Sequence, residues 1–170
     1  MRRGLATVLV GAALLLAACG GDDDAGSTDG SPTREEYIAR ADAFCKQANA
    51  KAKGLNERIR EAARAASPGR DQLRAIAPIL EEGYGLQRRA RDEFKEIPYP
   101  PADRAIVEKL HAAFDEQTAL VGRLLDASKA GDVARARALT EEQNRLKLQT
   151  RGMAQGYGFE ECGSGRNEAG

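Results

Sequence analysis

The sequence contains no tryptophan, one histidine and three cysteines, and only 5% of its 170 residues are aromatic. It also lacks an excess of charge of either sign, because 26 lysines and arginines balance 26 aspartates and glutamates. Domains that bind nucleic acid carry a basic excess that this chain does not have. We therefore expect no nucleic-acid partner.

The motifs of several enzyme classes are missing as well. No G-x-S-x-G motif supplies a nucleophilic serine, and the single histidine, His111, has no obvious partner for a catalytic triad. Neither a G-x-G-x-x-G motif after a strand nor a phosphate-binding loop is present, and no C-x-x-C pair suggests redox catalysis. We expect a protein that is not an enzyme and that uses no cofactor.

Alanine, leucine, arginine and glutamate, which are strong helix formers, are abundant in this chain. Apolar residues recur at intervals of three and four over residues 33–66, which predicts one long helix. Thr33 and Glu36 have the spacing of a capping box at its start. Ser67 is expected to cap the next helix, with Pro68 in the first turn of that helix.

Three more helical stretches follow, over about residues 68–96, 101–130 and 132–158. Pro78 should kink or break the first of these, because proline lacks an N–H group and clashes with the preceding turn. Gly131 has the position of a C-cap between the last two. Nothing resembles a strand. Long amphipathic helices with short connections predict an all-α fold, an antiparallel up-down-up-down four-helix bundle with a kinked second helix.

The beginning of the chain has a different composition. Two arginines precede an apolar stretch over residues 5–18, which is shorter than the roughly 20 residues that span a membrane and matches a secretory signal peptide. The sequence Leu16-Ala17-Ala18-Cys19 resembles the lipobox of bacterial lipoproteins. That resemblance implies a diacylglyceryl group on the Cys19 thiol and cleavage just before this residue. The chain would then be held by its acyl anchor on the outer face of the cytoplasmic membrane.

These features divide the chain into four parts. Residues 1–18 form the predicted lipoprotein signal peptide. Residues 19–32 comprise the lipidated cysteine and an acidic, glycine-rich tether whose composition predicts disorder. Residues 33–162 form the helical domain, and residues 163–170 form a tail that is expected to be flexible.

Cys45 and Cys162 remain if Cys19 carries lipid, and two cysteines in an exported chain pair in only one way. Helix lengths place them at compatible levels of the bundle, so we expect a disulfide. Two buried thiols or a redox-active pair are the alternatives. The segments around both cysteines and the Tyr-Pro-Pro connector at residues 99–101 resemble those of small all-helical lipoproteins from high-GC Gram-positive bacteria. That group has no assigned activity.

Glu108, His111 and Asp115 lie on one face of the third predicted helix. Glu-x-x-His is the motif of di-iron bundles, but such sites use the motif twice and one histidine allows a single copy. A surface histidine is the simpler interpretation, and a metal- or cofactor-binding bundle is the alternative function. A zinc site from Cys45, Cys162 and the histidine would require unpaired thiols.

Pro78, Gly83, Tyr84 and Gly85 mark the place where helix packing is most expected to open, and they are our candidate surface for a ligand or partner. The alternative is that they are only packing irregularities. Three arginines at 88, 89 and 91 are matched by nearby acids, which indicates a mixed surface or, alternatively, a docking patch for an anionic polymer. We expect a lipid-anchored, extracytoplasmic binding or structural module for an envelope protein, a cell-wall polymer or a small ligand.

Overall fold

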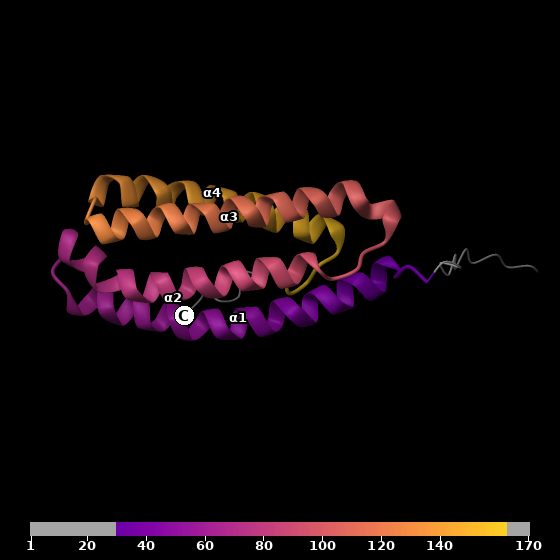
Figure 1. Ribbon diagram of the computed structural model, residues 1–170, viewed down its shortest axis with the longest axis horizontal. Coiled ribbons are helices and arrows are strands. Elements are labelled where there is room, and N and C mark those ends of the chain that lie inside the picture. The colour runs from indigo at the N-terminus through magenta and orange to yellow at the C-terminus, as the bar shows by residue number, and fades with distance from the viewer. Residues whose placement is uncertain (1–29, 163–170) are drawn as a thin grey trace, which may run out of the picture.

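The structure, a computed structural model, describes residues 30–162. The predicted signal peptide, Cys19, most of the tether and the tail lie outside the described residues. The described chain consists of α1 (Arg34–Ala65), α2 (Arg70–Lys95), the 3-10 helix η1 (Pro101–Asp103), α3 (Arg104–Ala130) and α4 (Val133–Tyr157). Successive α-helices run antiparallel (Figure 1), which confirms the predicted all-α, up-down-up-down bundle. None of these helices combines the length and apolarity needed to cross a membrane.

Local capping signals place most helix ends where the sequence predicts them. Thr33 Oγ1 accepts a hydrogen bond from the N–H of Glu36 (3.2 Å), and the Glu36 carboxylate accepts one from the N–H of Thr33 (3.1 Å). Gly131 ends α3 with a left-handed φ of 68°, and Gly158 ends α4 with a φ of 113°. The Asp132 carboxylate accepts a hydrogen bond from the N–H at the start of α4. Three of the four helices therefore begin or end at capping residues that the local sequence identifies.

The start of α2 differs from the prediction. Gly69, with a φ of 94°, is its N-cap, so Pro68 precedes the helix and the Ser67 side chain does not cap it. Instead the backbone carbonyl of Ser67 accepts a hydrogen bond from the N–H of Gln72 (3.1 Å), because the glycine turns the chain at this point. Downstream, α2 runs through Pro78 without a break. The proline ring is exposed, so its bulk does not disturb the packed side of the helix.

The extensive helix contacts are those between consecutive helices: α1 with α2, α2 with α3, and α3 with α4. The first and last helices do not pack along their length, so one side of the four-helix arrangement is open. They are joined by the segment after α4, which reaches back to α1 (Figure 1).

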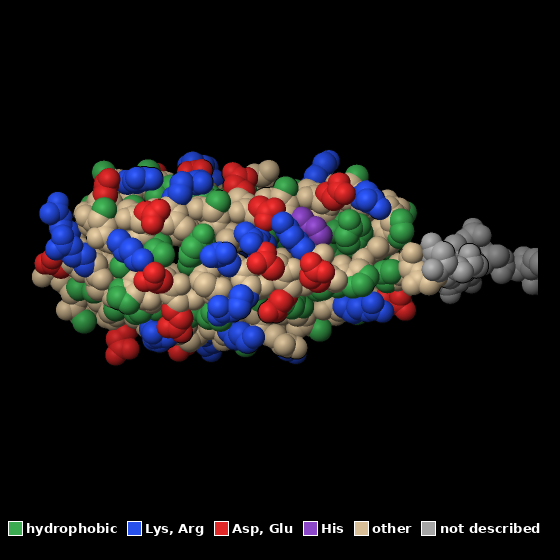
Figure 2. Space-filling model, in the orientation of Figure 1, with side chains coloured by type: hydrophobic (Ala, Val, Ile, Leu, Met, Phe, Trp, Pro, Cys, Tyr) green, Lys and Arg blue, Asp and Glu red, His purple; other side chains and the backbone are tan. Residues whose placement is uncertain are grey.

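The core has two parts at opposite ends of the bundle. We call the end that contains the start of α1 and the end of α4 the disulfide end, and the end that contains the α1–α2 and α3–α4 turns the turn end. An aromatic cluster fills the disulfide end, with Tyr37, Phe94, Tyr157 and Phe159 among its buried members. Leucines and alanines of α3 and α4 form the cluster towards the turn end. On the face that Figure 2 shows, cationic and acidic side chains are interspersed, and neither sign forms a large patch.

Candidate functional site

A cleft of about 510 Å³ lies inside the bundle and is lined by all four α-helices. We call it the central cleft. Its volume is in the range that small-molecule sites occupy. Along α1 its lining extends from Phe44 to Ile59, a span of about 22 Å at 1.5 Å per residue. The central cleft is therefore an elongated trough.

The cleft lies on the side of the bundle that remains open between α1 and α4. Ala48 and Ala52 line it where larger residues would be needed to reach α4. Because α1 and α4 do not pack along their length, the space between them is not closed by direct helix contact.

The walls of the cleft are apolar towards the turn end and polar in the middle. Gln117 Nε2 donates a hydrogen bond to Thr150 Oγ1 (2.9 Å), which ties α3 to α4, and Thr150 in turn donates to the carbonyl of Leu146. These groups are therefore oriented within the wall. The larger aliphatic side chains of the lining are Leu55, Ile59, Ile79, Leu80, Leu86 and Val121.

The charged residues that line the cleft are mostly basic. Five are cationic, namely Lys51, Arg89, Arg91, Lys147 and Arg151, and two are acidic, namely Glu93 and Glu161. In the described part of the chain, no acid forms an ion pair with Lys51 or Arg89. Arg91 is paired with Asp92 and lies 3.6 Å from Asp115. A chain with no net charge thus has a basic site.

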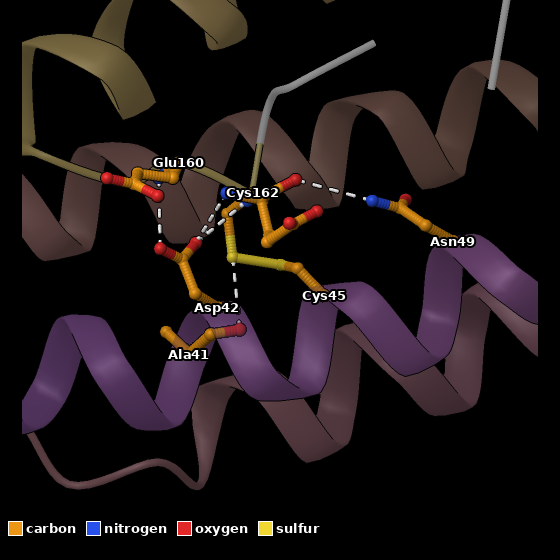
Figure 3. The surroundings of a disulfide bond; sticks show 7 residues. Ala41, Asp42, Cys45, Asn49, Glu160 and Cys162 are labelled. Atoms are coloured by element: carbon orange, nitrogen blue, oxygen red, sulfur yellow. Dashed lines mark hydrogen bonds between the residues drawn. A yellow bond between two sulfur atoms is a disulfide. The ribbon is translucent and has the colours of Figure 1, made fainter. Parts of the chain in front are cut away.

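A disulfide between Cys45 and Cys162 closes the cleft at the disulfide end, as predicted from the sequence (Figure 3). The Asp42 carboxylate lies beside it and accepts hydrogen bonds from three successive backbone N–H groups, at residues 160–162, each at 2.9 Å. Asn49 Nδ2 adds a bond to the carbonyl of Glu161 (3.3 Å). The paired cysteines also remove the zinc alternative, because its thiols are not free.

A buried acid at this end was missed by the sequence analysis. Asp103 ends η1 and is 7% exposed. Its carboxylate accepts hydrogen bonds from Arg34 Nε (2.9 Å) and from the Tyr157 hydroxyl (2.7 Å), and Arg34 also lies over the Tyr157 ring. Hydrogen bonding to Arg34 holds the pKa of Asp103 below its ordinary value. The pKa of Tyr157 is raised, first by burial and then by the bond to Asp103. These partners are 54 and 69 residues away, so no local pattern marks them.

The candidate metal ligands do not form a metal site. Both carboxylate oxygens of Asp115 accept bonds from Lys95 Nζ at 2.6 Å. The His111 ring packs edge-on against Phe94 and Tyr99, its Nε2 is buried without a hydrogen-bond partner, and burial lowers its pKa. Over residues 30–162 no three histidine, cysteine or acidic side chains are grouped so that they could hold a metal ion.

The candidate surface on α2 is divided between different sides of the helix. Gly83 lines the central cleft, and a Cβ atom placed on it would lie 3.6 Å from Leu55. Tyr84 packs against Gly122 of α3, where an added Cβ would lie 3.2 Å from the tyrosine ring. Pro78 lies apart, in a separate shallow depression between α2 and α3. Gly85 lies near the Arg89 side chain. Only one of the four residues therefore lines the main cleft.

Comparison of the chain with protein-family models, curated proteins and solved structures finds no match.

Proposed function

We propose that this protein is a non-enzymatic binding module whose ligand occupies the central cleft. The observation that carries the proposal is the cleft itself, a trough of about 510 Å³ with walls from all four helices. A protein interior is normally packed with few voids larger than a water molecule. A space of this size, with oriented polar groups among apolar walls, has the properties of a small-molecule site.

Mass spectrometry of material that co-purifies with the full chain tests this proposal. Ala52→Phe should fill the trough, and Ala50→Phe is the matched control because Ala50 is exposed on the same helix outside the lining. We expect a small molecule to be released on denaturation of the wild type and of Ala50→Phe, and to be absent from Ala52→Phe. A wild type without a bound molecule, or retention by Ala52→Phe, would contradict the proposal.

We also propose that Cys19 anchors the module to the outer face of the cytoplasmic membrane through acyl chains. The apolar segment before it and the Leu-Ala-Ala-Cys sequence support this. Two acyl chains hold a protein stably at a membrane, whereas one does so only marginally. The disulfide, which is a bond typical of exported proteins, is further support.

The anchor is tested by mass spectrometry of the membrane-extracted protein. We expect an N-terminal peptide that begins at Cys19 and carries acyl chains, and we expect Cys19→Ser to prevent acylation. An N-terminus at Met1 on a chain without lipid would rule out the anchor.

A further inference from the structure

We infer that the ligand of the central cleft is a single-chain lipid with an anionic head group, such as a fatty acid. This inference rests on the proposed function, since it assumes that the cleft is a binding site. Three properties of the cleft lead to it: its elongated shape, the separation of apolar and polar lining along its length, and the level at which its cations lie.

The shape favours an extended chain over a compact ligand. The trough follows α1 for about 22 Å, from Phe44 to Ile59. A flexible acyl chain matches a long, narrow space of this volume, and the aliphatic residues of its wall shield the chain from water. One chain rather than two suits a volume of about 510 Å³, which lies in the lower half of the range for small-ligand sites.

The cations lie at one level of the bundle, although they come from three helices. Leu55 faces Gly83, so Lys51 and Arg89 lie about 6 and 9 Å from that level towards the disulfide end. On the disulfide-end side of these cations, the Phe94 ring packs edge-on against Phe114. These contacts place Lys51 of α1 and Arg89 of α2 within one helical turn of each other along the bundle axis.

The basic residues of α4 lie at the same level. Thr150 is bonded to Gln117, one turn along α3 from Phe114, which places Thr150 near the level of Arg91 on α2. Lys147 and Arg151 flank Thr150 on α4, and both line the cleft. The cations therefore form a belt across the middle of the trough.

A belt of like charges is stabilised by a bound anion, because neighbouring cations repel one another. Lys51, Arg89 and Lys147 are exposed to solvent, so this repulsion is screened and the expected effect is modest. Lys51 and Arg89 have no acidic partner among residues 30–162, so the belt has charge left to neutralise. On the turn-end side of the belt, Ile59, Ile79 and Leu80 offer an apolar wall to the chain. A lipid whose head group lies at the belt and whose chain extends towards the turn end would contact both the cations and this apolar wall.

Photo-crosslinking of the full chain, carrying Cys19→Ser to prevent acylation, tests this inference. The probe is decanoic acid with a diazirine in its chain, because its length suits the roughly 12 Å of trough between Lys51 and Ile59, and the neutral comparison is the corresponding alcohol. We expect the acid to label peptides of the cleft about fivefold more than the alcohol, the ratio that about 1 kcal/mol of charge interaction produces.

Charge reversal assigns the effect to the belt. The double variant Lys51→Glu, Arg89→Glu should lose most labelling by the acid and keep labelling by the alcohol. The matched control is Lys53→Glu, Arg88→Glu, which changes two exposed cations of the same helices outside the lining and should behave as the wild type. Circular dichroism of each variant verifies that the helical content is unchanged.

The other outcomes each overturn the inference in a distinguishable way. Equal labelling of the cleft by acid and alcohol would leave the proposed binding function intact and remove the anionic head group. Labelling that occurs only after residues 163–170 are deleted would make the chain's own tail the occupant. Absence of cleft labelling by either probe, while another molecule co-purifies with the wild type, would show a different ligand class. If no molecule co-purifies either, the proposed function fails as well.

Discussion

The two ends of the bundle are held together by different interactions. At the disulfide end, a covalent bond, a buried acid with two partners and a cluster of aromatic rings join α1 to the end of α4 and to η1. At the turn end, buried leucines and alanines join α3 to α4, and the second half of α1 has Leu55 as its one buried residue. The comparison shows that α1 is fixed to α4 and η1 only near its N-terminus, and that the rest of α1 packs mainly against α2. The cleft extends along this second, less tightly packed part of α1.

The largest effect is expected from the disulfide, whose loss should remove most of the difference between the ends. The bond spans 117 residues, so the chain-entropy model assigns it about 5 kcal/mol of stability. We expect Cys45→Ala, Cys162→Ala to lower the free energy of unfolding in urea by this amount. The control is urea unfolding of the wild type in the presence of a reductant, which should give the same loss. If the double variant unfolds at the same urea midpoint as the oxidised wild type, the bond is not formed in the native protein.

The next largest effect is expected from Asp103→Asn, which keeps the shape of the side chain and removes its charge. We expect a loss of about 2 kcal/mol at pH 7, since bonds to a charged, buried acceptor are weakened. The pKa of Asp103 is lowered in the folded protein, so its contribution is present above the ordinary carboxyl pKa and is lost as the pH falls through the folded value. Wild type and variant should therefore converge in strong acid.

Asp92→Asn is the control for this comparison, because Asp92 is exposed and, among residues 30–162, forms an ion pair only with Arg91. If Asp103→Asn is as stable as Asp92→Asn, the buried acid does not contribute to the stability of the disulfide end.

At the turn end, Gly131→Ala should destabilise by about 1 kcal/mol. Gly131 has a φ of 68°, a backbone angle that residues other than glycine adopt at a cost in free energy. A Cβ atom at this position would also collide with the Arg70 side chain. Gly152→Ala on α4 is the matched control, because nothing lies near its Cβ position and alanine favours a helix. We expect the two variants to shift the melting temperature in opposite directions. Equal shifts would contradict a specific role for the turn.

The smallest effect is expected from His111 and is visible only as a pH dependence. Burial, with a contribution from Lys95, lowers its pKa in the folded state below the ordinary 6.5. The unfolded chain therefore binds a proton at higher pH than the folded chain, so stability should fall as the pH drops below about 7 towards the folded value. His111→Gln should flatten this region of the curve, measured by urea unfolding between pH 7.5 and 5. A slope that the substitution leaves unchanged would assign the effect elsewhere.

Much of the fold could be predicted from local sequence. The capping box at Thr33 and the glycine at 131 act within four residues, and the structure confirms both. The disulfide could be predicted because assigning Cys19 to the predicted lipobox left two cysteines, which can pair in only one way, and the structure shows that pair. At residues 67–69 the prediction was wrong, because serine, proline and glycine each suit a helix start and the backbone angle at the glycine decided among them.

The candidate site was not predictable in the same way. Of the four residues proposed on α2, Gly83 lines the cleft, and the basic residues at 89 and 91 were interpreted as a surface feature before the cleft was known. The Asp103–Tyr157 bond joins residues 54 positions apart and carries no sequence signature.

By itself, therefore, the sequence determined the helices and most of their caps, because hydrogen bonds and apolar periodicity within a helix act between residues three or four positions apart. The cysteine pair followed instead from the number of cysteines left to pair. Only the tertiary structure decided that α1 and α4 do not pack along their length, and that five basic residues line one trough. The physical reason is that packing between helices depends on the volumes of side chains that are brought together from distant parts of the chain.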